Sequence, residues 1–507
     1  MDYKKGTRST STSKLQREEN PWILGSPEMD NSCRSSSVPI LCFLFFLFFY
    51  LLILCFRDGM NTVFMNTVLV ISSSWENSDF NSTHVLFPTQ ITTSHEARAV
   101  AVSENSTLKT PPIINEVGNL SEAQVLEQGL ARARAAIRAV ASNGTRNASS
   151  SPFISTVDIH RNAAAFHQSY LEMERRFKVF VYEEGEPPLV HDGPCKSIYS
   201  SEGRFIHELE FGKTAFRTMD PQQAHVYFLP FSVTKMVTYI YDPKTRNRST
   251  LHSFISDYIH VVSSKYGFWN RSQGADHFML SCHDWAPWAS ETSSQLYNNS
   301  IRVLCNANTS EGFDPRKDVS LPEINLIGGH ISPKLLTALP EVYPRPYLVF
   351  FAGGVHGPIR PILLQHWKDK GDNDIRVFEY LPKGLDYYSF MLQSKFCLCP
   401  SGYEVASPRI VEAIHAECVP VIISDYYVLP FSDVFRWEKF SVEVSVVDIP
   451  RLKEILSSIS EEEYRMLKEG VRAVKMHFTL NQPPKRFDMF HMILHSIWLR
   501  RLNVRLQ

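Results

Sequence analysis

The sequence shows little excess of either charge. Its 52 Lys and Arg residues nearly balance its 53 Asp and Glu residues, which gives a formal net charge of −1 at pH 7. Because nucleic-acid-binding proteins usually carry a basic face, this balance argues against a DNA or RNA partner. The chain also lacks a GxSxG elbow, and no close pair of carboxylates fits retaining glycosidase chemistry, so two common classes of hydrolase find no support.

Long hydrophobic runs are scarce too, and one stands out. Residues 38–56 (VPILCFLFFLFFYLLILCF) contain no charge, and as a helix they would span about 28 Å, close to a bilayer core. A signal peptide is the alternative, but a long polar tail precedes the run and no small-residue cleavage site follows it. Basic residues concentrate before the run, which predicts a cytosolic tail at 1–37 and a lumenal remainder. The short span fits membranes of the early secretory pathway.

Glycosylation sequons support the same topology independently. All of the N-x-[ST] sites follow the apolar run, at Asn81, Asn105, Asn119, Asn143, Asn147, Asn247, Asn270, Asn298 and Asn308. Their one-sidedness predicts a lumenal chain, although the Ser/Thr-rich composition of residues 57–151 inflates their number.

Cysteine is sparse, with nine residues, of which six follow the apolar run. An oxidising lumen permits disulfides among these six, and Cys282 with Cys305 is a plausible local pair. Cys397 and Cys399 do not have zinc spacing. On a strand they would face opposite sides, which favours structural roles.

The 507 residues are enough for two or three domains. Residues 57–151 are predicted to form a stem that contains one amphipathic helix at about 121–141. That helix has two interpretations: a stalk or oligomer contact, and a helix that packs on its own catalytic domain.

From residue 152 onward, apolar strands alternate with helical segments, which predicts an α/β fold. We place a first Rossmann-like domain at 152–345, a second at 346–480 and a C-terminal helix at 481–507. Expected strands include 177–182, 224–228, 277–280, 300–306, 323–327, 347–352, 376–381, 396–399, 419–423 and 437–446.

Residues 396–425 (FCLCPSGYEVASPRIVEAIHAECVPVIISD) are the most informative stretch, because they predict a strand, a glycine turn, a helix and a parallel strand. Ser407 is the expected N-cap and Pro408 the first helical residue. Arg409 in the first turn can bind a diphosphate, and Glu412 can accept two ribose hydroxyls from nearly the same helix face. The alternative is a solvated ion pair between the two.

The segment from residue 346 repeats this design. A strand ends at Gly353-Gly354, and the following helix carries Arg360 in its first turn. Together with Gly402, the glycines predict two loops that hold one diphosphate from two sides.

His283 and Asp284 follow an apolar strand of the first domain, where α/β proteins form their sites. Either side chain could take a proton from a sugar hydroxyl. The alternative is a satisfied loop histidine and an aspartate that caps a turn. Asp372-Asn373-Asp374 spells the DxD motif of metal-dependent transferases, but its place between a helix and the next strand predicts a solvated turn.

The chain resembles plant members of the exostosin family, glycosyltransferase family forty-seven, from about residue 133 to 499. The resemblance rests on FKVFVYEEGEPP, AHVYFLPF, DHFMLSCHDW, FFAGGVHGPIRPIL and the long segment 396–423. It implies a two-domain GT-B fold and inverting sugar transfer in the Golgi, from a nucleotide sugar to a polysaccharide or a glycoprotein glycan. It also implies that no metal is bound.

Carried onto this chain, the resemblance makes Arg360, Ser407, Arg409 and Glu412 donor-site residues, with Asp284 or His283 as the general base. His356 departs from the pattern, since many relatives have Arg there, which puts donor choice or activity in doubt. A silent subunit of a transferase complex is the second hypothesis, and a lumenal glycan-modifying hydrolase is the third. Homo- or hetero-oligomers with other transferases remain open.

Overall fold

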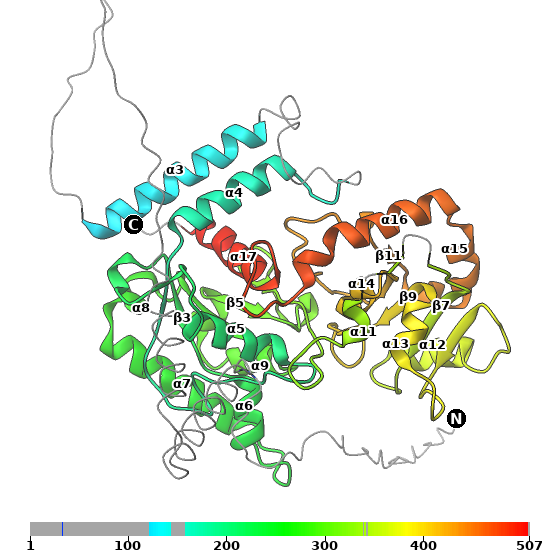
Figure 1. The fold of residues 1–507 in the computed structure, drawn as a ribbon. Coiled ribbons are helices and arrows are strands. Elements are labelled where there is room, and N and C mark those ends of the chain that lie inside the picture. Colours follow the sequence, from blue (N-terminus) through cyan, green and yellow to red (C-terminus); the bar gives the residue numbers. More distant parts are fainter. Residues whose placement is uncertain (1–32, 34–120, 143–157, 338, 341–342, 505–507) are drawn as a thin grey trace, which may run out of the picture. The chain divides into compact units, whose positions relative to one another are not determined.

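The structure is a computed structural model that describes residues 33, 121–142, 158–337, 339–340 and 343–504 (Figure 1). The predicted membrane segment at 38–56 and most of the predicted stem lie outside these ranges. In the part of the chain that is described, no helix combines the length and the apolar character needed to cross a bilayer.

The first sheet lies in the amino-terminal half and is parallel throughout. Its strand order is β2-β1-β3-β4-β5-β6. The strands are β1 (Val179–Val181), β2 (Arg217–Thr218), β3 (Val226–Leu229), β4 (His277–Ser281), β5 (Ile301–Leu304) and β6 (Val319–Ser320). The helices of this half are α4 (Ala163–Arg176), α5 (Ser200–Glu210), α6 (Val233–Tyr239), α7 (Ser249–Lys265), α8 (Gly267–Ser272), α9 (Ala286–Ser290) and α10 (Ser294–Asn298).

The second sheet has the order β11-β10-β9-β7-β8 and is also parallel. Its strands are β7 (Tyr347–Ala352), β8 (Ile375–Phe378), β9 (Ser394–Pro400), β10 (Val419–Ile423) and β11 (Val442–Glu443). Its helices are α12 (Ile359–Trp367), α13 (Tyr387–Leu392), α14 (Arg409–His415), α15 (Leu452–Ser458) and α16 (Glu461–Val474), and α11 (Pro333–Leu336) precedes β7. In each sheet the first strand in chain order, β1 or β7, lies inside the sheet. The second strand pairs on one side of it, and the later strands continue on the other side. This is the doubly wound arrangement.

Helix α17 (Met489–Asn503) returns the chain to the first half. It is capped by Asp488 and lies beside β5 and β6 (Figure 1). Arg501 Nε donates to His225 O at 2.7 Å, and Arg500 Nε donates to Asp318 O at 2.9 Å. The sequence predicted a C-terminal helix at 481–507, and the helix observed there packs on the first half. Two parallel α/β halves joined in this way are consistent with a GT-B-like fold.

Helix α3 (Glu122–Ser142) packs against α4 (Figure 1). Leu130 and Ala133 are fully buried, and Arg176 Nη1 donates to Gly129 O at 3.0 Å. Of the two interpretations of this helix, packing on its own catalytic domain is therefore confirmed.

Two expected strands are wrong. Residues 323–327 form only isolated bridges, at Ile324, Leu326 and Ile327, and the edge strand is β6 instead. Of the segment 437–446, only β11 is a strand, because a 3-10 turn occupies Trp437–Lys439. The β-branched residues of each segment favour a strand, and the tertiary surroundings override that local preference.

Disulfides join Cys282 to Cys305 and Cys397 to Cys418, while Cys399 is buried and free. The first pair was predicted. The structure also pairs Cys33 with Cys195. This bond conflicts with the predicted cytosolic tail at 1–37, because a cysteine on the cytosolic side of a span cannot reach a lumenal partner.

Candidate functional site

The loops after β7 and β9 lie at the point of the second sheet where the strand order reverses. β7 and β9 are neighbours, and the chain leaves them toward opposite edges. Ligands of doubly wound folds bind in the crevice at the carboxyl ends of such strands. The predicted glycines Gly353 and Gly402 fall in these two loops.

Arg409 opens α14 and reaches the end of β7. Its Nη2 donates to Ala352 O at 3.0 Å, and its guanidinium carbon lies 5.3 Å from the centre of the Phe351 ring. A Cβ at Gly353 would stand 2.5 Å from Nη2, so glycine is required for the guanidinium to lie there.

Ser407 was expected to cap this helix, but the residue in the N-cap position is Pro408, which makes no side-chain cap. Ser407 Oγ accepts long hydrogen bonds of 3.4 Å from both the backbone N and Nη1 of Arg409. The serine therefore steadies the arginine as well as the first turn.

Arg360 approaches from α12 and is 8% exposed. Its guanidinium makes no hydrogen bond or ion pair with any residue that the structure describes. Gly402 leaves space for it, since a Cβ there would lie 3.1 Å from Nη2. Burial, and then the charge of Arg409, lower the pKa of Arg360 to about 10. A buried and a half-buried guanidinium group that repel one another favour an anion between them.

Glu412 lies beside the arginines, as predicted, and is 7% exposed. Its carboxylate accepts from Tyr387 Oη and Tyr388 Oη at 3.2 Å each, and from Asn325 Nδ2 at 3.4 Å. Burial raises the pKa of Glu412, with Arg409 opposing the shift. These bonds are long, and a carboxylate has about four lone-pair sites, so it can accept further hydroxyls.

His356 lies in the loop after β7, with its ring centre 5.9 Å from that of Tyr403. Burial and the charges of Arg360 and Arg409 lower the pKa of His356. The imidazole is therefore neutral at pH 7, and it adds no positive charge to the site.

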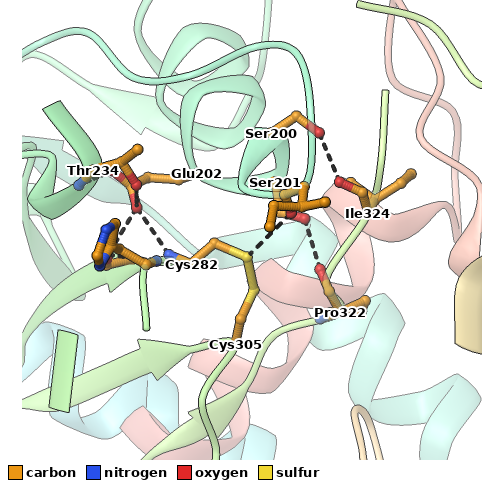
Figure 2. The surroundings of a disulfide bond; sticks show 11 residues. Ser200, Ser201, Glu202, Thr234, Cys282, Cys305, Pro322 and Ile324 are labelled. Carbon is orange, nitrogen blue, oxygen red and sulfur yellow. Dashed lines mark hydrogen bonds between the residues drawn. A yellow bond between two sulfur atoms is a disulfide. The ribbon is translucent and has the colours of Figure 1, made fainter. Parts of the chain in front are cut away.

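In the first half, a buried carboxylate fixes the end of β4. Glu202 accepts from Cys282 N at 2.8 Å, from Ser281 Oγ at 2.7 Å and from Thr234 Oγ1 at 3.0 Å (Figure 2). The Cys282–Cys305 disulfide ties the same position to the end of β5. These contacts determine where the next two residues, His283 and Asp284, lie.

His283 is buried, and its Nδ1 accepts from Trp285 N at 3.0 Å. Its ring centre is 5.0 Å from that of Tyr199. Burial lowers the pKa of His283 to about 3. This arrangement favours a positioning role for the histidine over a role as base.

Asp284 is better suited to be the base. Burial raises the pKa of Asp284 to about 6, while a hydrogen bond from Tyr199 opposes the shift. A carboxylate with this pKa is ionised near neutral pH yet more basic than an exposed aspartate. Of the two candidates for the base, the geometry therefore supports Asp284.

Asn306 gathers several residues that the sequence did not single out. Its Nδ2 lies 3.2 Å from Asp284 O, 3.0 Å from Glu311 Oε2 and 2.6 Å from Glu404 Oε2. Glu404 comes from the β9–α14 loop of the second half, so this amide joins the two halves at Asp284. Glu404 stands within the predicted motif, but nothing local revealed a partner about a hundred residues earlier.

Glu323 is a further missed residue, 7% exposed, in the segment predicted to be a strand. Burial and then the charge of Asp284 raise the pKa of Glu323, while Arg409 and Arg360 oppose the shift. Its carboxyl group is therefore close enough to Asp284 and to both arginines to interact with their charges.

The DxD residues are remote from this chemistry. Asp372 and Asp374 both pair with Lys453, and Asp374 N donates to Asp372 Oδ1 at 2.9 Å. The predicted turn is confirmed.

Four sequons fall in described residues. Asn247, Asn270 and Asn298 are exposed. Asn308 is 8% exposed, and its Nδ2 donates to Glu311 Oε1 at 3.0 Å. This geometry leaves no room for a glycan, so the structure argues against Asn308 as an acceptor.

Residues 173–459 match the family model described as the Exostosin GT47 domain. Two relatives described as probable glycosyltransferases of Arabidopsis thaliana are 60% and 57% identical over 405 and 388 residues. These alignments cover 80% and 76% of this chain, and 83% and 74% of the relatives. A probable glucuronosyltransferase of Oryza sativa subsp. japonica is 30% identical over 345 residues, covering 64% of this chain and 77% of its own.

Proposed function

The chain belongs to the exostosin GT47 family of glycosyltransferases, and we propose that it transfers a sugar from a UDP-sugar, with inversion, to a cell-wall polysaccharide or a glycoprotein glycan. The nucleotide sugar binds at the carboxyl edge of the second sheet. The acceptor enters from the first half, beside Asp284.

One observation carries this proposal: Arg360 is a buried guanidinium group beside the half-buried Arg409, and it forms no hydrogen bond or ion pair with a described residue. A diphosphate would supply the missing negative charge. When the sugar departs, the same groups would stabilise the charge that develops on the leaving diphosphate, a task that a metal performs in other transferases. We therefore propose that transfer needs no metal.

In the transfer step, Asp284 takes the proton of an acceptor hydroxyl. The acceptor oxygen forms a bond to the anomeric carbon on the face opposite the diphosphate, and the bond from that carbon to the diphosphate oxygen breaks. Its electron pair leaves with the diphosphate. The proton ends on Asp284 and the charge between Arg360 and Arg409, so the step is balanced.

We further propose a Golgi membrane protein of type II, anchored by residues 38–56. The uncharged run, the excess of basic residues before it and the sequons after it support this topology. The Cys33–Cys195 bond opposes it. Protease treatment of intact microsomes decides between them, because the proposal requires an N-terminal tag to be digested while the rest of the chain is protected.

The function is tested by turnover of UDP- and GDP-sugars by the purified full chain, with and without EDTA. We expect selective slow hydrolysis of one donor, unaffected by EDTA and lost in Arg409→Ala. Arg451→Ala is the matched control, because this exposed arginine pairs only with Asp448 and Glu454. A folded protein that turns over no donor would contradict the proposal and favour a silent partner subunit.

A further inference from the structure

The charges of the site are divided between two neighbouring places. The second half contributes Arg360 and Arg409 at the ends of β7 and β9. The carboxylates of Glu311 and Glu404 and the backbone carbonyl of Asp284 gather around the Asn306 amide, with hydrogen bonds to it of 2.6 to 3.2 Å. The buried Glu323 interacts electrostatically with Asp284 and with both arginines.

A nucleotide sugar fits this division in one direction. Its diphosphate belongs with the two arginines, and the sugar that it carries then extends past Glu323 toward Asp284 and Asn306. The transfer step requires the same direction, because Asp284 must reach the hydroxyl that attacks the anomeric carbon.

The region around Asn306, where the sugar would lie, already contains several carboxyl groups. Burial, followed by the charges of Asp284 and Glu311, raises the pKa of Glu404 to about 8. Glu404 is therefore mostly protonated at pH 7, because its negative charge would be buried and would repel those of Asp284 and Glu311. A further carboxylate on the sugar would add to this repulsion.

One described cation besides the two arginines acts on this place, since the charge of Arg248 lowers the pKa of Glu404, but the carboxyl groups of Asp284, Glu311 and Glu404 outnumber it. Arg360 and Arg409 face the diphosphate. Arg248 is the remaining guanidinium near Glu404, and it lies over aromatic rings, 3.9 Å from the centre of Trp285 and 5.7 Å from that of Trp288. It forms no ion pair with the described carboxylates.

The same place suits hydroxyl groups. Asn306 is 1% exposed, and its Oδ1 is buried without a hydrogen-bond partner. An unpartnered buried acceptor is costly, and a sugar hydroxyl would satisfy it. The carboxyl groups around it can accept further hydroxyls.

We propose that the donor sugar is uncharged, a neutral hexose or pentose whose hydroxyls are held by Asn306 and the surrounding carboxyl groups, and that uronic acids are excluded. This inference rests on the proposed function and narrows its substrate class. It sets this chain apart from the 30% identical relative described as a probable glucuronosyltransferase.

The test compares donors that differ only at C6. Calorimetric titration of the full chain would use UDP, UDP-glucose against UDP-glucuronate, UDP-galactose against UDP-galacturonate, and UDP-xylose, which lacks C6. We expect the preferred neutral donor to bind at least about 100-fold more tightly than either uronate, which is roughly what one like-charge contact costs at a protein surface. Equal or tighter binding of a uronate overturns the inference, whether or not transfer is then observed.

A variant shows whether the acidic place causes the discrimination. Asp284→Asn removes one such like-charge contact, so the ratio between neutral and uronate affinities should fall by about 100-fold. Asp372→Asn, in the remote turn, should leave the ratio unchanged. A ratio unchanged in Asp284→Asn contradicts the electrostatic explanation. If the proposed function is wrong, UDP itself should not bind, and this result is distinct from a loss of discrimination between neutral sugars and uronates.

Discussion

At the scale of single residues, function depends on side chains that are held in unfavourable surroundings. Arg360 is buried beside a like charge, Asp284 is a buried carboxyl group, and Asn306 Oδ1 has no partner. Each of these features costs stability in the empty protein and is relieved by a substrate or a proton. Such costs are common where binding and catalysis take place.

Asp284 leads to a prediction about the pH dependence of transfer. Because the ionised form accepts the proton, the rate should rise with pH through about 6 and level off above it. Asp284→Asn should lower transfer by at least about 100-fold and abolish this limb. Initial rates from pH 4.5 to 8 measure both effects. A limb that persists in the variant would assign the base to another group.

Asp284 also leads to a prediction about stability: the substitution that lowers activity should stabilise the folded protein. Its pKa of about 6 in the folded protein lies above the ordinary 3.8, so the ionised form costs folding free energy. The cost is absent below about pH 3.8 and is complete above about pH 6. Asp284→Asn should therefore stabilise the inactive protein at pH 7.5, by up to about 3 kcal/mol, and by much less at pH 4. Urea unfolding at the two pH values tests this difference, and equal effects at both would contradict it.

At the scale of elements, the ends of β4 and β5 are joined by the Cys282–Cys305 disulfide shortly before Asp284, the proposed base. This bond closes a segment of 23 residues, and loop-closure entropy assigns it about 3 kcal/mol. Changing both cysteines to serine should lower the free energy of unfolding by about that amount. It should also reduce transfer activity, because the end of β4 positions Asp284. A double variant that unfolds like the parent would show that the bond contributes nothing.

Helix α3 is a second element with a measurable contribution. Leu130 is fully buried where α3 meets α4, whereas Val125 of the same helix is 50% exposed. Leu130→Ala should destabilise the protein by about 2–5 kcal/mol, and Val125→Ala by less than about 0.5 kcal/mol. Thermal unfolding of both variants measures the difference. Equal small effects would mean that α3 is a detached stalk.

At the scale of the whole molecule, the sequence predicts the two α/β halves and the second sheet well. The strands at 347–352 and 419–423 have the predicted bounds, because long apolar runs with clear turns leave little choice. The grouping of Gly402, Ser407, Arg409 and Glu412 could be predicted because one local motif carries all four residues. The acidic place could not, since Asn306 and Glu404 meet only through folding. The short strand β6 could not be predicted either, because its pairing with β5, rather than the local sequence, determines which residues form it.

The central claim is that Arg360 and Arg409 hold the diphosphate of the donor. The most direct measurement is calorimetric titration of UDP into the full chain, Arg360→Met, Arg409→Ala and Arg451→Ala. We predict that each of the first two variants loses about 10- to 100-fold in affinity, as expected for a charge-assisted hydrogen bond, and that Arg451→Ala binds like the parent. Arg360→Met keeps most of the buried stem and removes a repelled charge, so the empty variant should be at least as stable as the parent. Unchanged UDP affinity in both stable site variants would contradict the account.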